Sequence, residues 1–171
     1  MKYFTPEKYQ ALQASSGEAM DAGDDNWERA VTDYERHLQI IRPDLPESIR
    51  HLQDDFYLHD ADVILMGRQG NDFVIALWLT TPPGNFLVLT YYLVKEPTIT
   101  SIGCPREQLS RKTKWLFDEM DVVPGAERTF IHTILLSNGC HVQLSFREVR
   151  AALLQSLLPE PFPHAETLAG V

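Results

Sequence analysis

The dipeptide Asn138-Gly139 lies between two runs of alternating residues and constrains the fold more than any other feature of the sequence. Asn-Gly in this setting is the strongest short-range signal for a β-hairpin, closed by a type I′ turn. With these two residues as the loop, Ser137 pairs with Cys140 and the register of both strands follows. The predicted core face is Ile131, Thr133, Leu135, Val142, Leu144 and Phe146. The opposite face is mixed and is expected to be half-buried: Phe130, His132, Ile134, Leu136, His141, Gln143, Ser145 and Arg147.

Apolar runs upstream of this hairpin predict further strands, joined by turns rich in Gly, Asn and Pro. The runs lie at 63–68, 73–79, 86–94, 99–102 and 114–121, although the last also fits a helix. Beyond Arg150 the apolar segment AALLQSLL predicts a short helix, and the proline-rich residues 159–171 predict an irregular tail.

The first 56 residues have a helical period instead. Thr5-Pro6 predicts the start of a helix, and 14–17 predicts its end. Residues 24–26 are expected to cap a second, longer helix that Pro43 ends, and a short third helix follows Pro46. The apolar stripe of the second helix is Trp27, Ala30, Val31, Tyr34, Leu38 and Ile41.

These patterns together predict a single domain of class α+β over residues 1–171. A helical segment, 1–56, is expected to pack on a mostly antiparallel sheet of five or six strands within 62–150.

The formal charge is -9, and the isoelectric point is near 5.0. Residues 1–60 hold six basic and thirteen acidic side chains, so the negative charge is concentrated there. An excess of carboxylates repels nucleic acids and anionic lipids, and it favours a basic partner. No apolar run is as long as a membrane span, and Cys104 and Cys140 are too few for a disulfide framework. We therefore expect a cytoplasmic protein that binds neither nucleic acid nor membrane.

The histidines and cysteines do not have the spacing of a metal site. Cys140 and His141 are neighbours on a strand and point to opposite faces. His132 and His141 share a face in the predicted register, but they lie roughly 13 Å apart along the strand. We expect neither a metal nor another cofactor.

The densest ionisable cluster surrounds His59, where the helices meet the sheet. One interpretation is an acid/base pair in which Asp60 or Asp62 positions His59. The favoured interpretation is a structural turn at His59, like the turn at Asn138 and Gly139. No catalytic nucleophile is tied to the cluster by a sequence motif.

Two acidic clusters with neighbouring aromatic residues are candidate partner-binding surfaces, in which carboxylates attract a basic protein and aromatic rings anchor it. The first comprises Asp54, Asp55, Tyr57, Asp60 and Asp62. The second comprises Trp115, Asp118, Glu119 and Asp121. The alternative for both is a charged surface that serves solubility alone.

Three short motifs carry a resemblance: Met-Lys-Tyr-Phe-Thr at the start, Leu58-His59-Asp60-Ala61-Asp62-Val63, and the hairpin 135–139. They resemble a bacterial family of unassigned function that opens in the same way and enters its sheet through a Leu-His-Asp step. In size, charge and predicted fold class, the chain is also similar to immunity proteins of contact-dependent growth inhibition systems. This resemblance implies an antitoxin that binds a cognate toxin domain, plausibly a basic nuclease, without covalent chemistry.

Two other functions stay open at this point. The first is a small hydrolase or transferase that uses His59 with Asp60 or Asp62. The second is a self-associating regulatory scaffold that uses the mixed face of the Asn138-Gly139 hairpin. The immunity protein is the leading hypothesis.

Overall fold

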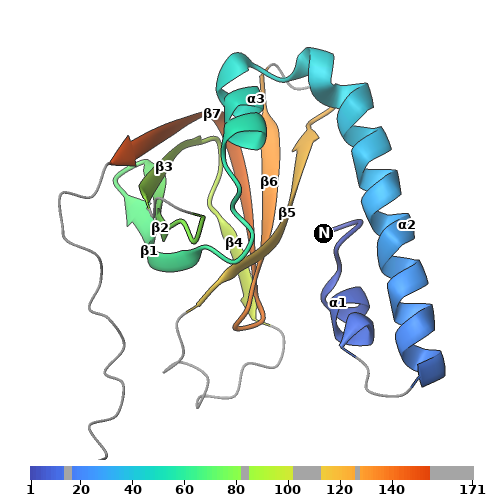
Figure 1. Cartoon of the computed structure of the whole chain (residues 1–171). Helices are drawn as coiled ribbons and strands as arrows, with labels where there is room; N and C mark the ends of the chain where they lie inside the picture. The colour runs from blue at the N-terminus through green and yellow to red at the C-terminus, as the bar shows by residue number, and fades with distance from the viewer. Residues whose placement is uncertain (14–16, 82–84, 102–112, 126–127, 155–171) are drawn as a thin grey trace, which may run out of the picture.

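The computed structural model describes residues 1–13, 17–81, 85–101, 113–125 and 128–154. Its helices come first and its strands follow, so the α+β class is confirmed (Figure 1). The helices are α1 (Pro6–Leu12), α2 (Gly17–Ile41), the 3-10 turn η1 (Arg42–Asp44) and α3 (Glu47–Asp55). The strands are β1 (Asp62–Gln69), β2 (Asp72–Trp78), β3 (Phe86–Leu93), β4 (Thr98–Ser101), β5 (Trp115–Val122), β6 (Phe130–Leu136) and β7 (Cys140–Leu154).

The strands form one antiparallel sheet in the order β1-β2-β3-β7-β6-β5, and β4 pairs with β7. The sheet curls until its two end strands meet, because Asp62 at the start of β1 bridges Lys114 just before β5. The backbone N–H of Trp115 donates to the carbonyl of Ala61 at 2.9 Å across the same seam. This seam fixes the start of β5 beside the end of the helical segment.

The register predicted for the Asn138-Gly139 hairpin is wrong by one residue. Three residues, not two, separate β6 from β7, and His132 pairs with Leu144. Gly139 has a φ of 76°, and its N–H donates to the Leu136 carbonyl at 3.0 Å. A three-residue loop that ends in a left-handed glycine forms a bulge and shifts the pairing by one position.

The shift turns the other face of β6 toward the main core. Phe130, Ile134 and Leu136 lie there with the correctly predicted residues of β7: Val142, Leu144 and Phe146. His132 faces the core too. It therefore does not share a face with His141, contrary to the prediction. Thr133 and Leu135 are also buried, but on the opposite face.

Two helix predictions also differ from the structure. α2 begins at Gly17, ahead of the predicted cap at 24–26, because 18–22 is a good helix-forming stretch. The predicted helix after Arg150 is wrong, since β7 continues as a strand to Leu154. There the strand pairs with β3, and this tertiary pairing overrides local preference. The predicted tail 159–171 and Cys104 lie outside the described residues.

A close approach between α1 and α2 depends on Gly23. A Cβ atom at this position would lie 2.5 Å from the backbone carbonyl oxygen of Ala11. Glycine is unfavourable in a helix interior, and replacing it with alanine ordinarily adds about 1 kcal/mol of stability. Here the clash involves backbone, which cannot move aside without separating the helices.

We therefore expect Gly23→Ala to destabilise the protein by about 1 to 2 kcal/mol, because overpacking outweighs the gain in helix propensity. Gly17→Ala is the matched control, since a Cβ there meets nothing within 4 Å. Chemical denaturation of both variants measures the difference. A Gly23→Ala protein more stable than the wild type would show that the two helices do not pack this closely.

Candidate functional site

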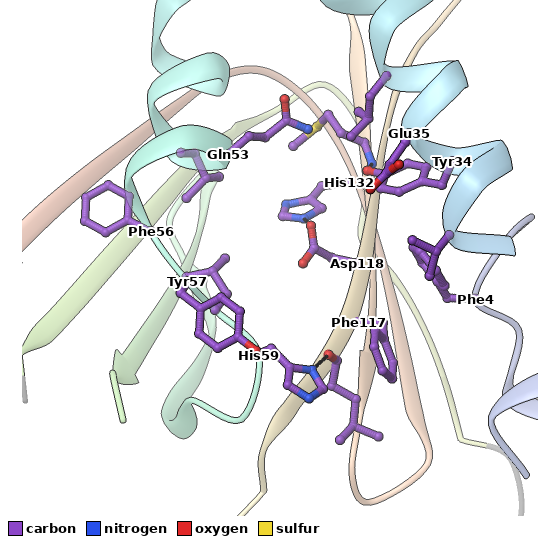
Figure 2. A pocket seen from close by; sticks show the side chains of 16 residues that line it. Phe4, Tyr34, Glu35, Gln53, Phe56, Tyr57, His59, Phe117, Asp118 and His132 are labelled. Carbon is purple, nitrogen blue, oxygen red and sulfur yellow. Dashed lines mark hydrogen bonds and ion pairs between the residues drawn. The ribbon is translucent and has the colours of Figure 1, made fainter. Parts of the chain in front are cut away.

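A pocket with a volume of about 450 Å³ lies between α2, α3 and β5. It is open to the surface, and its walls are mainly apolar and aromatic. Its lining includes Phe4, Tyr34, Leu38, Leu52, Phe56, Tyr57, Phe117 and Met120, with Glu35, Gln53, His59, Asp118 and His132 as polar members. Figure 2 shows Asp118 and His132 pointing into this space between the side chains of α2 and those of α3.

An acid–histidine pair lies at the base of the pocket. His132 Nε2 and Asp118 Oδ2 are 2.9 Å apart, with the His132 side chain 1% exposed and the Asp118 side chain 28% exposed. The Asp118 carboxylate therefore faces the pocket, whereas the imidazole lies behind it. β5 and β6 are paired neighbours in the sheet, which brings the two side chains together.

Two further side chains extend this pair into the core. The Trp115 indole N–H donates to Asp118 Oδ1 at 2.9 Å, and the Tyr91 hydroxyl lies 2.9 Å from His132 Nδ1. One proton arrangement satisfies all of these atoms: Tyr91 donates to Nδ1, and His132 donates from Nε2 to Asp118. In this arrangement His132 is neutral and the carboxylate keeps its negative charge.

Opposing effects act on the pKa of the Asp118 carboxyl. Burial alone would raise it, but the hydrogen bond from His132 lowers it. The Trp115 hydrogen bond and His59 also lower it, and the net pKa is below the usual value. Burial raises the pKa of the Tyr91 phenol well above its usual value, and the negative charge of Asp118 adds to this. The pocket therefore presents a carboxylate, and the neutral Tyr91 phenol lies in the core behind His132.

Tyr57 and His59 lie in the segment between α3 and β1 that forms part of the pocket rim. The Tyr57 side chain is exposed, at 61%. His59 Nδ1 bonds the backbone carbonyl of Leu116, and its ring lies 4.9 Å from that of Phe117 (Figure 2). These contacts hold His59 as a fixed part of the wall.

The alternative interpretation of His59, an acid/base pair with Asp60 or Asp62, is not assembled in the structure. Asp60 Oδ2 is 3.6 Å from His59 Nε2, and its side chain is 53% exposed. Asp62 instead lies 3.8 Å from the ammonium group of Lys114. Asp60 also has a φ of 64°, in the left-handed region, which is typical of a residue in a tight turn. The geometry at His59 is that of a turn anchored to β5.

The first acidic cluster does not form a bare anionic surface. Arg42 binds both carboxylate oxygens of Asp54, and His51 bonds Asp55. The pairs of Asp60 with His59 and of Asp62 with Lys114 complete the set. Each carboxylate of this cluster thus has a cationic or titratable partner, which reduces its reach as a steering charge.

The structure divides the second acidic cluster between three environments. Asp118 faces the pocket, and Asp121 pairs with His37 of α2 at 3.1 Å. Glu119 is buried, and its carboxylate accepts the backbone N–H groups of 2–4 at 2.6 to 2.7 Å. Trp115 was a candidate partner-binding residue, with a place in the core as the other interpretation; it is 0% exposed because the curled sheet encloses it, so the partner-binding interpretation is wrong for this residue.

Sequence reasoning missed His132, Tyr91 and Tyr34 as polar residues that organise this region. The alternation of this histidine with Phe130, Ile134 and Leu136 was a signal, but the incorrectly predicted register assigned it to the half-buried face. Tyr34 accepts the backbone N–H of Met120 at 2.7 Å and so covers part of the β5 edge. No local sequence pattern predicts that the Tyr34 hydroxyl accepts this hydrogen bond.

The chemistry of the pocket follows from the carboxylate at its bottom and from its aromatic walls. A fixed carboxylate inside an apolar pocket favours a cation, and aromatic faces add to that preference. Within the described ranges, no group of three or more His, Cys, Asp or Glu residues could hold a metal ion. None of the described helices is long and apolar enough to cross a membrane.

Comparisons with known proteins add no relative to this description. No family model, curated protein or solved structure matches the chain.

Proposed function

We propose that this protein is a cytoplasmic immunity protein that binds a basic toxin domain stoichiometrically and without covalent chemistry. The observation that carries the proposal is the open aromatic pocket with the Asp118 carboxylate at its base and Tyr57 exposed at its rim. An aromatic anchor beside a fixed charge is typical of surfaces that recognise proteins.

The contact surface of this proposal is the face where α2 and α3 border the pocket. Glu35 of α2 adds a second carboxylate to the lining, and the whole chain has a formal charge of -9. Charge of this sign accelerates association with a basic protein and repels nucleic acid, which is the substrate of a nuclease toxin. The resemblance to contact-dependent growth inhibition immunity proteins supplies the class of partner.

The direct test is co-expression with the toxin domain that this proposal expects to be encoded beside the gene, followed by calorimetry of the purified pair. We expect rescue of growth and a 1:1 complex whose affinity falls as salt is added. Tyr57→Ala should weaken the complex about tenfold, because interface aromatics commonly contribute more than 1 kcal/mol.

Ile99→Ala is the matched control, since Ile99 is 53% exposed on β4 and does not line the pocket. It should leave the affinity unchanged. If co-expression does not rescue growth and no complex forms, the proposal is refuted. A complex that is insensitive to Tyr57→Ala would move the contact to another face.

A further inference from the structure

We infer that the pocket receives one arginine side chain of the partner and that Asp118 binds its guanidinium group. This inference rests on the proposed function for the source of the arginine. It adds to that function the site that the partner's side chain enters, the carboxylate that binds it, and a preference for arginine.

The position of Asp118 requires a long side chain. The carboxylate lies at the base of a pocket of about 450 Å³, behind a rim that includes Tyr57 and Glu35. The Asp118 side chain is nevertheless 28% exposed, so a group that enters the pocket can reach it. Arginine combines a stem of three methylenes, which packs on apolar walls, with a charge at its end.

The way Asp118 is held favours two parallel hydrogen bonds. Its Oδ1 accepts from Trp115 and its Oδ2 from His132, so the orientation of the carboxylate is fixed. Each carboxylate oxygen can accept two hydrogen bonds, and each has one such donor within the described residues. A guanidinium can bond both oxygens at once with its planar pair of N–H donors.

The walls favour guanidinium over ammonium. The Tyr57 ring lines the pocket and its side chain is exposed, and a guanidinium stacks on such a face while an ammonium stays strongly hydrated. A lysine ammonium is more strongly hydrated than a guanidinium, so moving it into a pocket with a mostly apolar lining costs more free energy.

The neutral tautomer of His132 keeps the site anionic. An imidazolium would leave the Tyr91 hydroxyl hydrogen without an acceptor among the described side chains. With the imidazole uncharged, the carboxylates of Asp118 and Glu35 make the charge of the pocket negative. His59 also lies on the wall of the pocket. A cation that enters is therefore matched by charge as well as by shape.

The test uses capped arginine, Nα-acetyl-arginine-N-methylamide, titrated into the ¹⁵N-labelled full chain by NMR. The Trp115 indole N–H reports directly, because it donates to Asp118. We expect millimolar binding that shifts this resonance. The capped citrulline analogue, which has the same shape without the charge, should bind at least tenfold more weakly, and capped lysine severalfold more weakly.

Two variants locate the site. Asp118→Asn should weaken arginine binding at least tenfold, whereas Asp121→Asn, on the same strand and outside the pocket, should not change it. Tyr57→Ala tests the wall without a folding risk, since the side chain is 61% exposed, and it should weaken binding severalfold. Equal shifts with citrulline, or binding that ignores both Asp118→Asn and Tyr57→Ala, would overturn the inference.

The outcomes separate this inference from the proposed function. A chain that binds its toxin and ignores capped arginine refutes the subsite alone. A chain that binds capped arginine through Asp118 and forms no toxin complex supports the subsite and refutes the immunity function.

Discussion

Glu119→Ala is expected to destabilise the protein by about 3 kcal/mol, because three backbone donors, buried or partly buried, lose one shared acceptor. In the structure both oxygens of this carboxylate are used: Oε2 accepts from Lys2 N, and Oε1 accepts from Tyr3 N and Phe4 N. The residue itself is 7% exposed, so water cannot replace it without a rearrangement.

The loss should spread beyond the carboxylate. Residues 2–4 lie between α2 and β5, where Phe4 is 6% exposed and contacts Tyr34, Trp27 and Phe117. Releasing this segment removes the middle layer between the long helix and the sheet. We therefore expect faster hydrogen exchange at the amides of 2–4 and at Met120, whose N–H donates to Tyr34.

Denaturant unfolding and exchange of the same samples measure both effects. Asp121→Ala is the matched control, since its carboxylate lies two residues along the strand and is half exposed; its pair should contribute no more than about 1 kcal/mol. Glu119→Gln should fall between the two, because its amide oxygen can accept and its NH₂ group cannot. Equal unfolding free energies for Glu119→Ala and Asp121→Ala would show that Glu119 does not anchor this segment.

Local patterns predicted most of the elements because each depends on neighbours in the sequence. Thr5 accepts from the N–H of Lys8 at the start of α1, as its place before Pro6 predicted. α2 ends at Ile41, ahead of Pro43, and Ile49 and Leu52 of α3 are buried as expected. The helix ends involve contacts within one turn of helix, and the buried positions of α3 follow from the spacing of its apolar residues, so residue type and spacing predict both.

The hairpin shows where such patterns stop being sufficient. Asn138-Gly139 correctly marked the turn, but both two-residue and three-residue loops accept glycine in a left-handed conformation. The choice between them moves every side chain of β6 to the other face. Packing decides it, since the observed register buries Phe130, Ile134 and Leu136 against β7.

The candidate site was harder to predict because its partners are distant in the sequence. Tyr91 and His132 are 41 residues apart, and Glu119 and Lys2 are 117 apart. Acidic residues at 118, 119 and 121 looked alike in sequence and were grouped as one surface. Strand alternation and the curl of the sheet send them to the pocket, the N-terminal segment and α2.

His132→Leu is expected to cost about 3 kcal/mol at neutral pH, because it leaves the Asp118 carboxylate and the Tyr91 hydroxyl without their shared partner. Leucine has a similar volume, so the loss reports the hydrogen bonds more than a cavity. His51→Leu is the matched control: His51 pairs with Asp55 one helical turn away, both side chains are more than half exposed, and its removal should cost no more than about 1 kcal/mol.

The pH dependence of the same variant tests the cause. In the wild type the folded-state pKa of Asp118 is lowered, so its stabilising contribution is present above the unfolded value of about 3.9 and is lost as the pH falls through the folded pKa. Without His132, burial dominates and should raise that pKa, which reverses the sign of the contribution. The stability difference between wild type and His132→Leu should therefore shrink as the pH falls from 7 to 3, as Asp118 becomes protonated. Urea unfolding across this range measures the difference, and a gap that stays constant with pH would show that Asp118 does not depend on His132 for its charge.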